Sequence, residues 1–94
     1  MVKSFKHKRL EKFFLAGSTK EIQAIHANKL SRILMTMNEM SSLNDLSSPA
    51  YRLRRLTGNL KNQWAVTVQA NWRVTFEFDK ETKNVYIVDY LDYH

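Results

Sequence analysis

Cysteine is absent from the 94-residue sequence, which excludes disulfide bonds, cysteine-ligated zinc and a thiol nucleophile. Glycine occurs twice and proline once, so collagen-like and low-complexity chains are excluded as well. No apolar run approaches the roughly 18–20 residues that a membrane-spanning helix needs, so we expect no membrane partner. The basic N-terminal segment lacks a continuous apolar core and a small-residue cleavage site, so we expect a cytoplasmic protein without a secretory signal.

Positive charge is in excess and unevenly distributed. The formal net charge is +6, with 15 Lys and Arg against 9 Asp and Glu. Residues 1–55 carry a net +7, whereas residues 56–94 carry a net −1. A chain of this length forms one small domain, so we expect a single domain over residues 1–94. Such a basic domain attracts polyanions, nucleic acid first among them, although a basic surface can also serve solubility alone.

The first half of the chain shows helical periodicity. Residues 2–5 suit a short opening strand, and a helix is expected from His7 to about Leu15, ending at Gly17. Residues 18–21 read Ser-Thr-Lys-Glu, the pattern of a capping box, which predicts a long helix to about Met40. Residues 41–50 are rich in turn-forming residues and predict a loop.

The second half alternates with a period of two. Segments 51–55, 64–69, 72–79 and 85–91 predict four strands joined by short turns, which form an antiparallel meander. We therefore expect an α+β fold in which two N-terminal helices pack on a mainly antiparallel sheet of four to five strands. In segment 72–79 the large apolar side chains would face the helices, and Arg73 and Glu77 would face the open side.

Two groups of residues on this framework could carry chemistry. Arg73 is unusual in a strand built for packing, and it either serves a site or forms a salt bridge with Glu77. Asp92, Tyr93 and His94 are side chains that transfer or orient protons. Their alternative role is structural, with the tyrosine packed at the sheet edge and the histidine in a tail.

A third group is the arginine cluster at residues 52–55, followed by Lys61. Arg52 and Arg54 would share one face of a strand, an arrangement that favours a bound anion such as phosphate. The alternative is a solvated edge strand with basic side chains. His7 and His26 have no ligand-like spacing, so we expect no metal site. The sequence contains no phosphate-binding glycine loop and no nucleophile elbow.

Four segments together resemble one known family. MVKSFKHKRLEKFF, YRLRRLTGN, NWRVTFEF and VDYLDYH resemble the HigB toxins of bacterial toxin–antitoxin systems, within the RelE superfamily. The resemblance implies a RelE-like fold and a ribosome-dependent endonuclease that cuts mRNA in the A site of the 70S ribosome. It implies attack by the ribose 2′-OH without metal or cofactor. It also implies a HigA-type helix-turn-helix antitoxin. The toxin would act on promoter DNA only through this antitoxin.

The resemblance also assigns roles to residues. Arg73 matches a phosphate-stabilising arginine, and Asp92, Tyr93 and His94 match a terminal Asp-Tyr-His that supplies proton-transfer groups, without indicating which is the base. Basic residues that would hold RNA or the ribosome, including its 16S rRNA, are Lys6, Lys8, Arg9, Arg52, Arg54, Arg55 and Lys61.

The sequence departs from the family at two positions. Many HigB-like chains carry a histidine and a lysine where this chain has Arg54 and Thr57. Arg54 can hold phosphate but cannot act as an acid, because its pKa exceeds about 12. Two rival functions remain: a non-catalytic basic module that binds RNA or the ribosome, and a basic protein-interaction domain.

Overall fold

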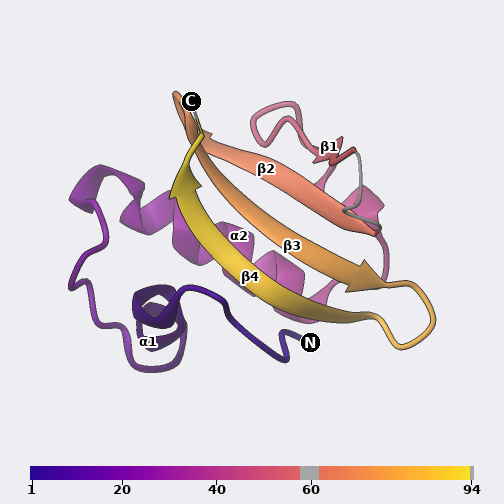
Figure 1. The fold of residues 1–94 in the computed structure, drawn as a ribbon, viewed down its shortest axis with the longest axis horizontal. Helices are drawn as coiled ribbons and strands as arrows, with labels where there is room; N and C mark the ends of the chain where they lie inside the picture. The colour runs from indigo at the N-terminus through magenta and orange to yellow at the C-terminus, as the bar shows by residue number, and fades with distance from the viewer. Residues whose placement is uncertain (58–61, 94) are drawn as a thin grey trace.

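The computed structural model describes residues 1–57 and 62–93. Two helices and a four-stranded sheet form two layers, with α2 lying across one face of the sheet (Figure 1). The elements, with their bounds, are α1 (Lys8–Ala16), the 3₁₀ helix η1 (Ala24–His26), α2 (Ala27–Glu39), the 3₁₀ helix η2 (Leu43–Leu46), β1 (Arg54–Arg55), β2 (Gln63–Gln69), β3 (Trp72–Asp79) and β4 (Asn84–Asp92). Within the described residues, no helix has the length and apolar character that crossing a membrane requires.

The sheet has the order β1-β2-β3-β4, and every neighbouring pair is antiparallel. The N-terminal segment lies along the outer edge of β4 through two isolated parallel bridges, Val2 to Val85 and Phe5 to Val88. The sheet is thus mainly antiparallel with a partial fifth, parallel edge. The predicted α+β architecture, with helices packed on a mainly antiparallel sheet, is confirmed.

The core lies between α2 and the sheet, where the apolar face of the helix packs on the apolar face of the strands. Along β3 the side chains alternate as expected, with Val74, Phe76 and Phe78 buried. Leu30, Ile33, Leu34 and Met37 supply the facing stripe of α2. The open face of the sheet is therefore formed by the residues between the buried ones, which include Arg73 and Glu77.

The first helix begins and ends close to the predicted residues. His7 caps α1 because its Nδ1 accepts a hydrogen bond from the Leu10 backbone N–H at 3.0 Å. Gly17 ends the helix in the left-handed conformation, with φ of 72°, which glycine adopts without steric penalty.

The predicted capping box is wrong. Glu21 has a left-handed backbone with φ of 62°, and its carboxylate binds Arg9 at 3.3 Å. The chain forms a turn there, and α2 begins six residues later, at Ala27, after η1. Ile25, which falls within the predicted long helix, lies in η1 and is 73% exposed. The conformation of this segment is determined by how the chain connects α1 to the core, and not by the local capping motif.

Two strand boundaries also differ from the prediction. The expected strand over 51–55 is reduced to β1 because Arg52 has a left-handed backbone with φ of 46°. The last strand extends one residue further, so that Asp92 belongs to β4 and pairs with Trp72. The predicted turn between segments 51–55 and 64–69 includes residues 58–61, which lie outside the described residues.

Candidate active site

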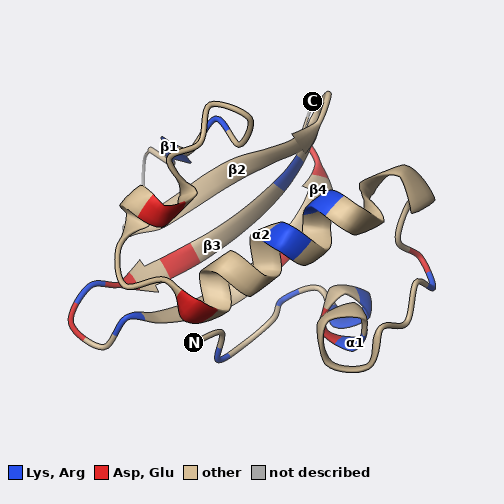
Figure 2. Ribbon diagram, turned by 180° about the vertical axis from the view of Figure 1, so that it is seen from behind, with Lys and Arg blue, Asp and Glu red and all other residues tan. Residues whose placement is uncertain are grey.

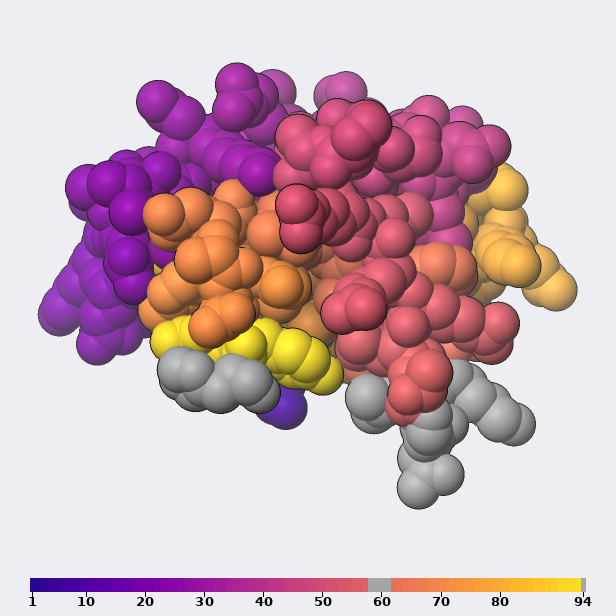
Figure 3. Space-filling model, turned by 90° about the horizontal axis from the view of Figure 1, so that it is seen from above, coloured from indigo at the N-terminus to yellow at the C-terminus, as the bar shows by residue number. Residues whose placement is uncertain are grey.

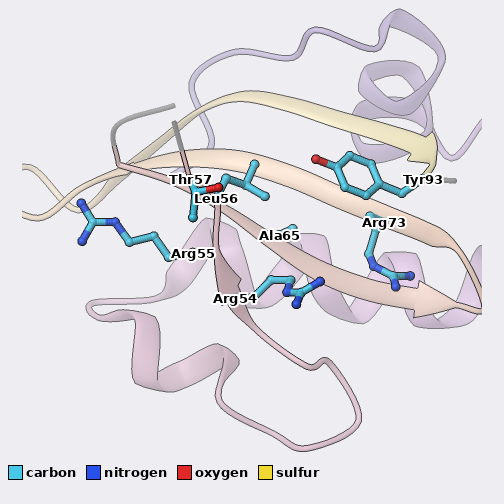
Figure 4. A pocket seen from close by; sticks show the side chains of 7 residues that line it. All are labelled: Arg54, Arg55, Leu56, Thr57, Ala65, Arg73 and Tyr93. Carbon is cyan, nitrogen blue, oxygen red and sulfur yellow. The ribbon is translucent and has the colours of Figure 1, made fainter. Parts of the chain in front are cut away.

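Two adjoining hollows lie on the open side of the sheet, near the end of β4 (Figure 4). The first has a volume of about 290 Å³ and is lined by Arg54, Arg55, Leu56, Thr57, Ala65, Arg73 and Tyr93. The second has a volume of about 390 Å³ and is lined by Arg52, Leu53, Arg54, Thr67 and Arg73. Arg54 and Arg73 line both, so the hollows form one continuous surface. Figure 3 shows the segments around residues 52–57, the β2–β3 turn and the end of β4 next to one another.

The segment before β1 is fixed to β2 by its backbone. The Thr67 N–H donates to the Tyr51 carbonyl at 2.6 Å, and Arg54 pairs with Ala65 one step further along. Between the hydrogen bond at Tyr51 and the strand pairing at Arg54, the chain bends at Arg52. The bend, rather than strand alternation, brings Arg52 and Arg54 to the same hollow. Arg54 extends toward Arg73 in Figure 4, whereas Arg55 extends in the opposite direction.

Arg73 stands on β3 between Thr67 of β2 and Leu91 of β4. Its Nη1 donates hydrogen bonds to the carbonyl oxygens of Ala70 and, at 3.2 Å, Trp72. The salt bridge considered as the alternative role is not formed, because no ion pair between described residues joins Arg73 to Glu77. A guanidinium has five N–H donors, so the group that faces the hollow retains donors for an anion.

Tyr93 lines the same hollow as Arg54 and Arg73. Its side chain is 44% exposed, and its backbone N–H donates to the Asn71 carbonyl at 2.7 Å. In Figure 4 the phenol ring lies over the sheet, with its hydroxyl toward Leu56 and Thr57. Asp92, the preceding residue, is exposed at the end of β4 and does not line either hollow. His94 lies outside the described residues.

The charge around the hollows is positive. No carboxylate is among the described residues that line them. The positive charge continues onto α2, where burial, followed by the charges of Arg32 and Arg52, lowers the pKa of Lys29. The Lys29 Nζ donates to the Ala50 carbonyl at 2.9 Å. Figure 2 shows the basic residues along α2.

Lys29 and Arg32 were not among the predicted binding residues. They are three positions apart on a helix, which places them on neighbouring turns. Their proximity to Arg52 depends on how the segment before β1 crosses α2, and only the structure reveals it.

The remaining predicted binding residues lie elsewhere. Lys6 and Lys8 are exposed at the start of α1, beside the β4 edge of the sheet and away from β1 (Figure 1). Arg9 forms its ion pair with Glu21 on the same side. Lys61 is outside the described residues. In the part of the chain that the structure describes, no three histidine or acidic side chains gather as metal ligands.

Comparison with known proteins agrees with this geometry. The family model described as the RelE-like toxin of type II toxin–antitoxin system HigB matches residues 3–94. The Endoribonuclease HigB of Proteus vulgaris is 36% identical over 94 residues, which cover the whole of both chains. The chain belongs to the HigB-like toxin family. The predicted family is confirmed, and so is the enzyme class, endoribonuclease.

The two departures from the HigB-like pattern both fall within the site. Arg54 and Thr57 line the first hollow together with Arg73 and Tyr93. Arg54 supplies a permanent cation there and Thr57 supplies a hydroxyl. The described residues that line this hollow include three arginines, one threonine and one tyrosine.

Proposed function

We propose that this HigB-like toxin is a single-domain cytoplasmic enzyme that cleaves mRNA in the A site of the 70S ribosome. The observation that carries the proposal is the first hollow, which Arg54, Arg73 and Tyr93 line together without a carboxylate among the described lining residues. An RNA phosphate is an anion with planar oxygen edges, which guanidinium groups bind through paired hydrogen bonds.

The proposed reaction is a transesterification within the RNA. The ribose 2′-oxygen attacks the adjacent phosphorus, and the bond from phosphorus to the 5′-oxygen of the next nucleotide breaks. The products are a 2′,3′-cyclic phosphate and a free 5′-OH. The 2′-OH must lose a proton, the 5′-oxygen must gain one, and the phosphorane between these steps carries extra negative charge.

Each requirement has candidate groups in this chain. Arg73 and Arg54 stabilise the phosphorane, because both residues line the hollow, Arg54 from β1 and Arg73 from β3 on the other side of β2. Asp92, Tyr93 and His94 supply the proton-transfer groups, since a guanidinium keeps its proton throughout the physiological range. This assignment makes no use of a metal ion or cofactor.

The second hollow suits a neighbouring phosphate of the same RNA strand. Arg52, Arg54 and Arg73 line it, and Lys29 and Arg32 continue the positive surface onto α2. Lys6, Lys8, Arg9 and Arg55 would make more distant contacts with the ribosome, including 16S rRNA, and Lys61 would also bind RNA or the ribosome. A HigA-type helix-turn-helix antitoxin would neutralise the toxin and link it to promoter DNA.

Ribosome dependence provides the test. The described site has no histidine pair to act as acid and base on free RNA, so correct positioning of mRNA by the ribosome should supply much of the rate. We expect codon-positioned cleavage on 70S complexes and at least about a thousandfold slower cleavage of naked RNA. Efficient cutting of naked RNA would contradict ribosome dependence. Ribosome binding without any cleavage would favour the non-catalytic binding module.

A further inference from the structure

Among the residues that the structure describes, His26 is the polar residue that is fully buried in the core, and the proposed reaction makes no use of it. The side chain is 0% exposed. Its Nδ1 lies 2.7 Å from the Tyr90 hydroxyl and its Nε2 lies 3.0 Å from the Gln69 side-chain oxygen. The Trp72 ring packs against the rings of Tyr90 and His26. Its centroid lies 4.7 Å from that of Tyr90 and 5.6 Å from that of His26.

The direction of each hydrogen bond follows from the partners. The Gln69 oxygen can only accept, so Nε2 carries the ring proton and donates it. Nδ1 then accepts from the Tyr90 hydroxyl. Burial raises the pKa of Tyr90, while a hydrogen bond from the Gln23 backbone acts against that rise. The phenol therefore keeps its proton as the donor, and both nitrogens of His26 are satisfied.

The Gln69 end of this network lies at the turn that holds the site. Gln69 is the last residue of β2, and Ala70 continues the turn with a left-handed φ of 51°. The Ala70 carbonyl accepts from the Arg73 guanidinium, and the Asn71 carbonyl accepts from the Tyr93 N–H. The same turn thus contacts the buried histidine on one side and both site residues on the other.

We propose that His26 is a positioning residue that, through Gln69, fixes the β2–β3 turn in the conformation that aligns Arg73 with Tyr93. The role rests on the proposed function of that site. A buried imidazole is costly unless hydrogen-bonded, and a fully satisfied network selects one arrangement of the groups it joins. An apolar residue would fill the same volume without specifying where Gln69, and hence the turn, must lie.

Gln69→Leu is the most direct test, because it removes the acceptor while His26 and the core stay in place. Gln63→Leu is the matched control, since Gln63 is at the other end of the same strand, opposite Glu77. We expect Gln69→Leu to lower the single-turnover rate on ribosome-bound mRNA about tenfold to a hundredfold. Ribosome affinity should change less than twofold. The melting temperature should fall below that of the control, because the buried Nε2 of His26 loses its acceptor, but the protein should stay folded at the assay temperature.

A second readout does not depend on cleavage. In Gln69→Leu the Tyr93 amide should exchange with solvent faster, and the NMR signals of the Arg73 guanidinium should shift, while Gln63→Leu leaves both unchanged. His26→Gln keeps a donor near the Nε2 position and should retain most of the rate. His26→Leu should behave like Gln69→Leu.

The outcomes separate the two proposals. Unchanged rate, Tyr93 exchange and Arg73 signals in a folded Gln69→Leu protein would overturn the positioning role. A rate loss matched by an equal loss in Gln63→Leu would overturn it too, because it would show general destabilisation. If the unmodified protein cuts no mRNA at all, the proposed function fails, and the amide exchange and guanidinium signals still decide the role of His26.

Discussion

The open face of the sheet has two ends with opposite chemistry. At the Arg73 end, the hollow of about 290 Å³ has arginines and hydroxyls in its wall. At the β3–β4 end, a larger hollow of about 420 Å³ is lined by Asn62, Glu77, Phe78, Asp79, Lys80 and Glu81. Both ends lie along β3, and the larger space carries the charge that repels RNA. For a polyanion, the sign of the charge therefore identifies the site and the volume does not.

Among the substitutions that test this difference between the two ends, Arg73→Ala is expected to have the largest effect on the cleavage rate. Loss of the phosphorane-stabilising cation should lower the single-turnover rate on ribosome-bound mRNA by about 10² to 10³. Glu77→Ala, on the same face of the same strand, should leave the rate unchanged. Cleavage kinetics and thermal unfolding of both variants provide the measurement. Equal rates for Arg73→Ala and Glu77→Ala would show that the basic end is not the catalytic end.

Arg54→Ala should have a smaller effect, on binding as well as on rate. A lost charge-assisted hydrogen bond weakens affinity about tenfold, and the salt dependence of binding to single-stranded RNA should fall by about 0.7 in log–log slope. RNA with 2′-O-methyl groups cannot attack itself, so its binding can be measured over a salt series. Lys80→Ala, at the acidic end, serves as the control. A slope that drops equally in both variants would mean that RNA does not discriminate between the ends.

Asp79→Asn tests the acidic end alone and should have the smallest effect. Hydrogen bonds from the Glu81 and Thr82 backbones lower the pKa of Asp79. A lowered pKa stabilises the fold above the ordinary aspartate value of about 3.9, and that contribution is lost as the pH falls through the folded-state pKa.

We therefore expect a slightly lower melting temperature for Asp79→Asn at neutral pH and a difference that vanishes in strong acid. Cleavage should not change. A melting-temperature difference that persists at low pH would mean that the turn is stabilised by something other than the carboxylate.

The fold was predictable where one pattern dominated. The alternation over Trp72–Asp79 predicted β3, its buried face and the placement of Arg73 on the opposite face, because successive side chains of a strand point to opposite faces. The start of α2 was not predictable. The local Ser-Thr-Lys-Glu pattern suits a helix start, but Glu21 binds Arg9 and the chain turns there. That ion pair joins two separate segments, and a local motif contains no information about it.

The candidate site was predictable in part. The resemblance named Arg73 and Tyr93, and the structure brings them to one hollow. Lys29 and Arg32 were missed because their nearness to Arg52 depends on tertiary packing. His26 was not predicted as a site residue because it lacks ligand-like spacing. That criterion detects metal sites, but it does not detect a histidine whose hydrogen-bond partners lie 43 and 64 residues away.

The two backbone carbonyls that hold Arg73 have a consequence for the thermodynamics of binding. A free arginine side chain carries about 2 kcal/mol of rotamer entropy, which a ligand must overcome when it immobilises the group. Here Ala70 and Trp72 already restrict the guanidinium in the unbound protein. That entropy is lost during folding rather than at the encounter with RNA, so the free-energy gain from each phosphate contact is correspondingly larger. Calorimetry should find a smaller unfavourable entropy for the contact made by Arg73 than for the one made by Arg52.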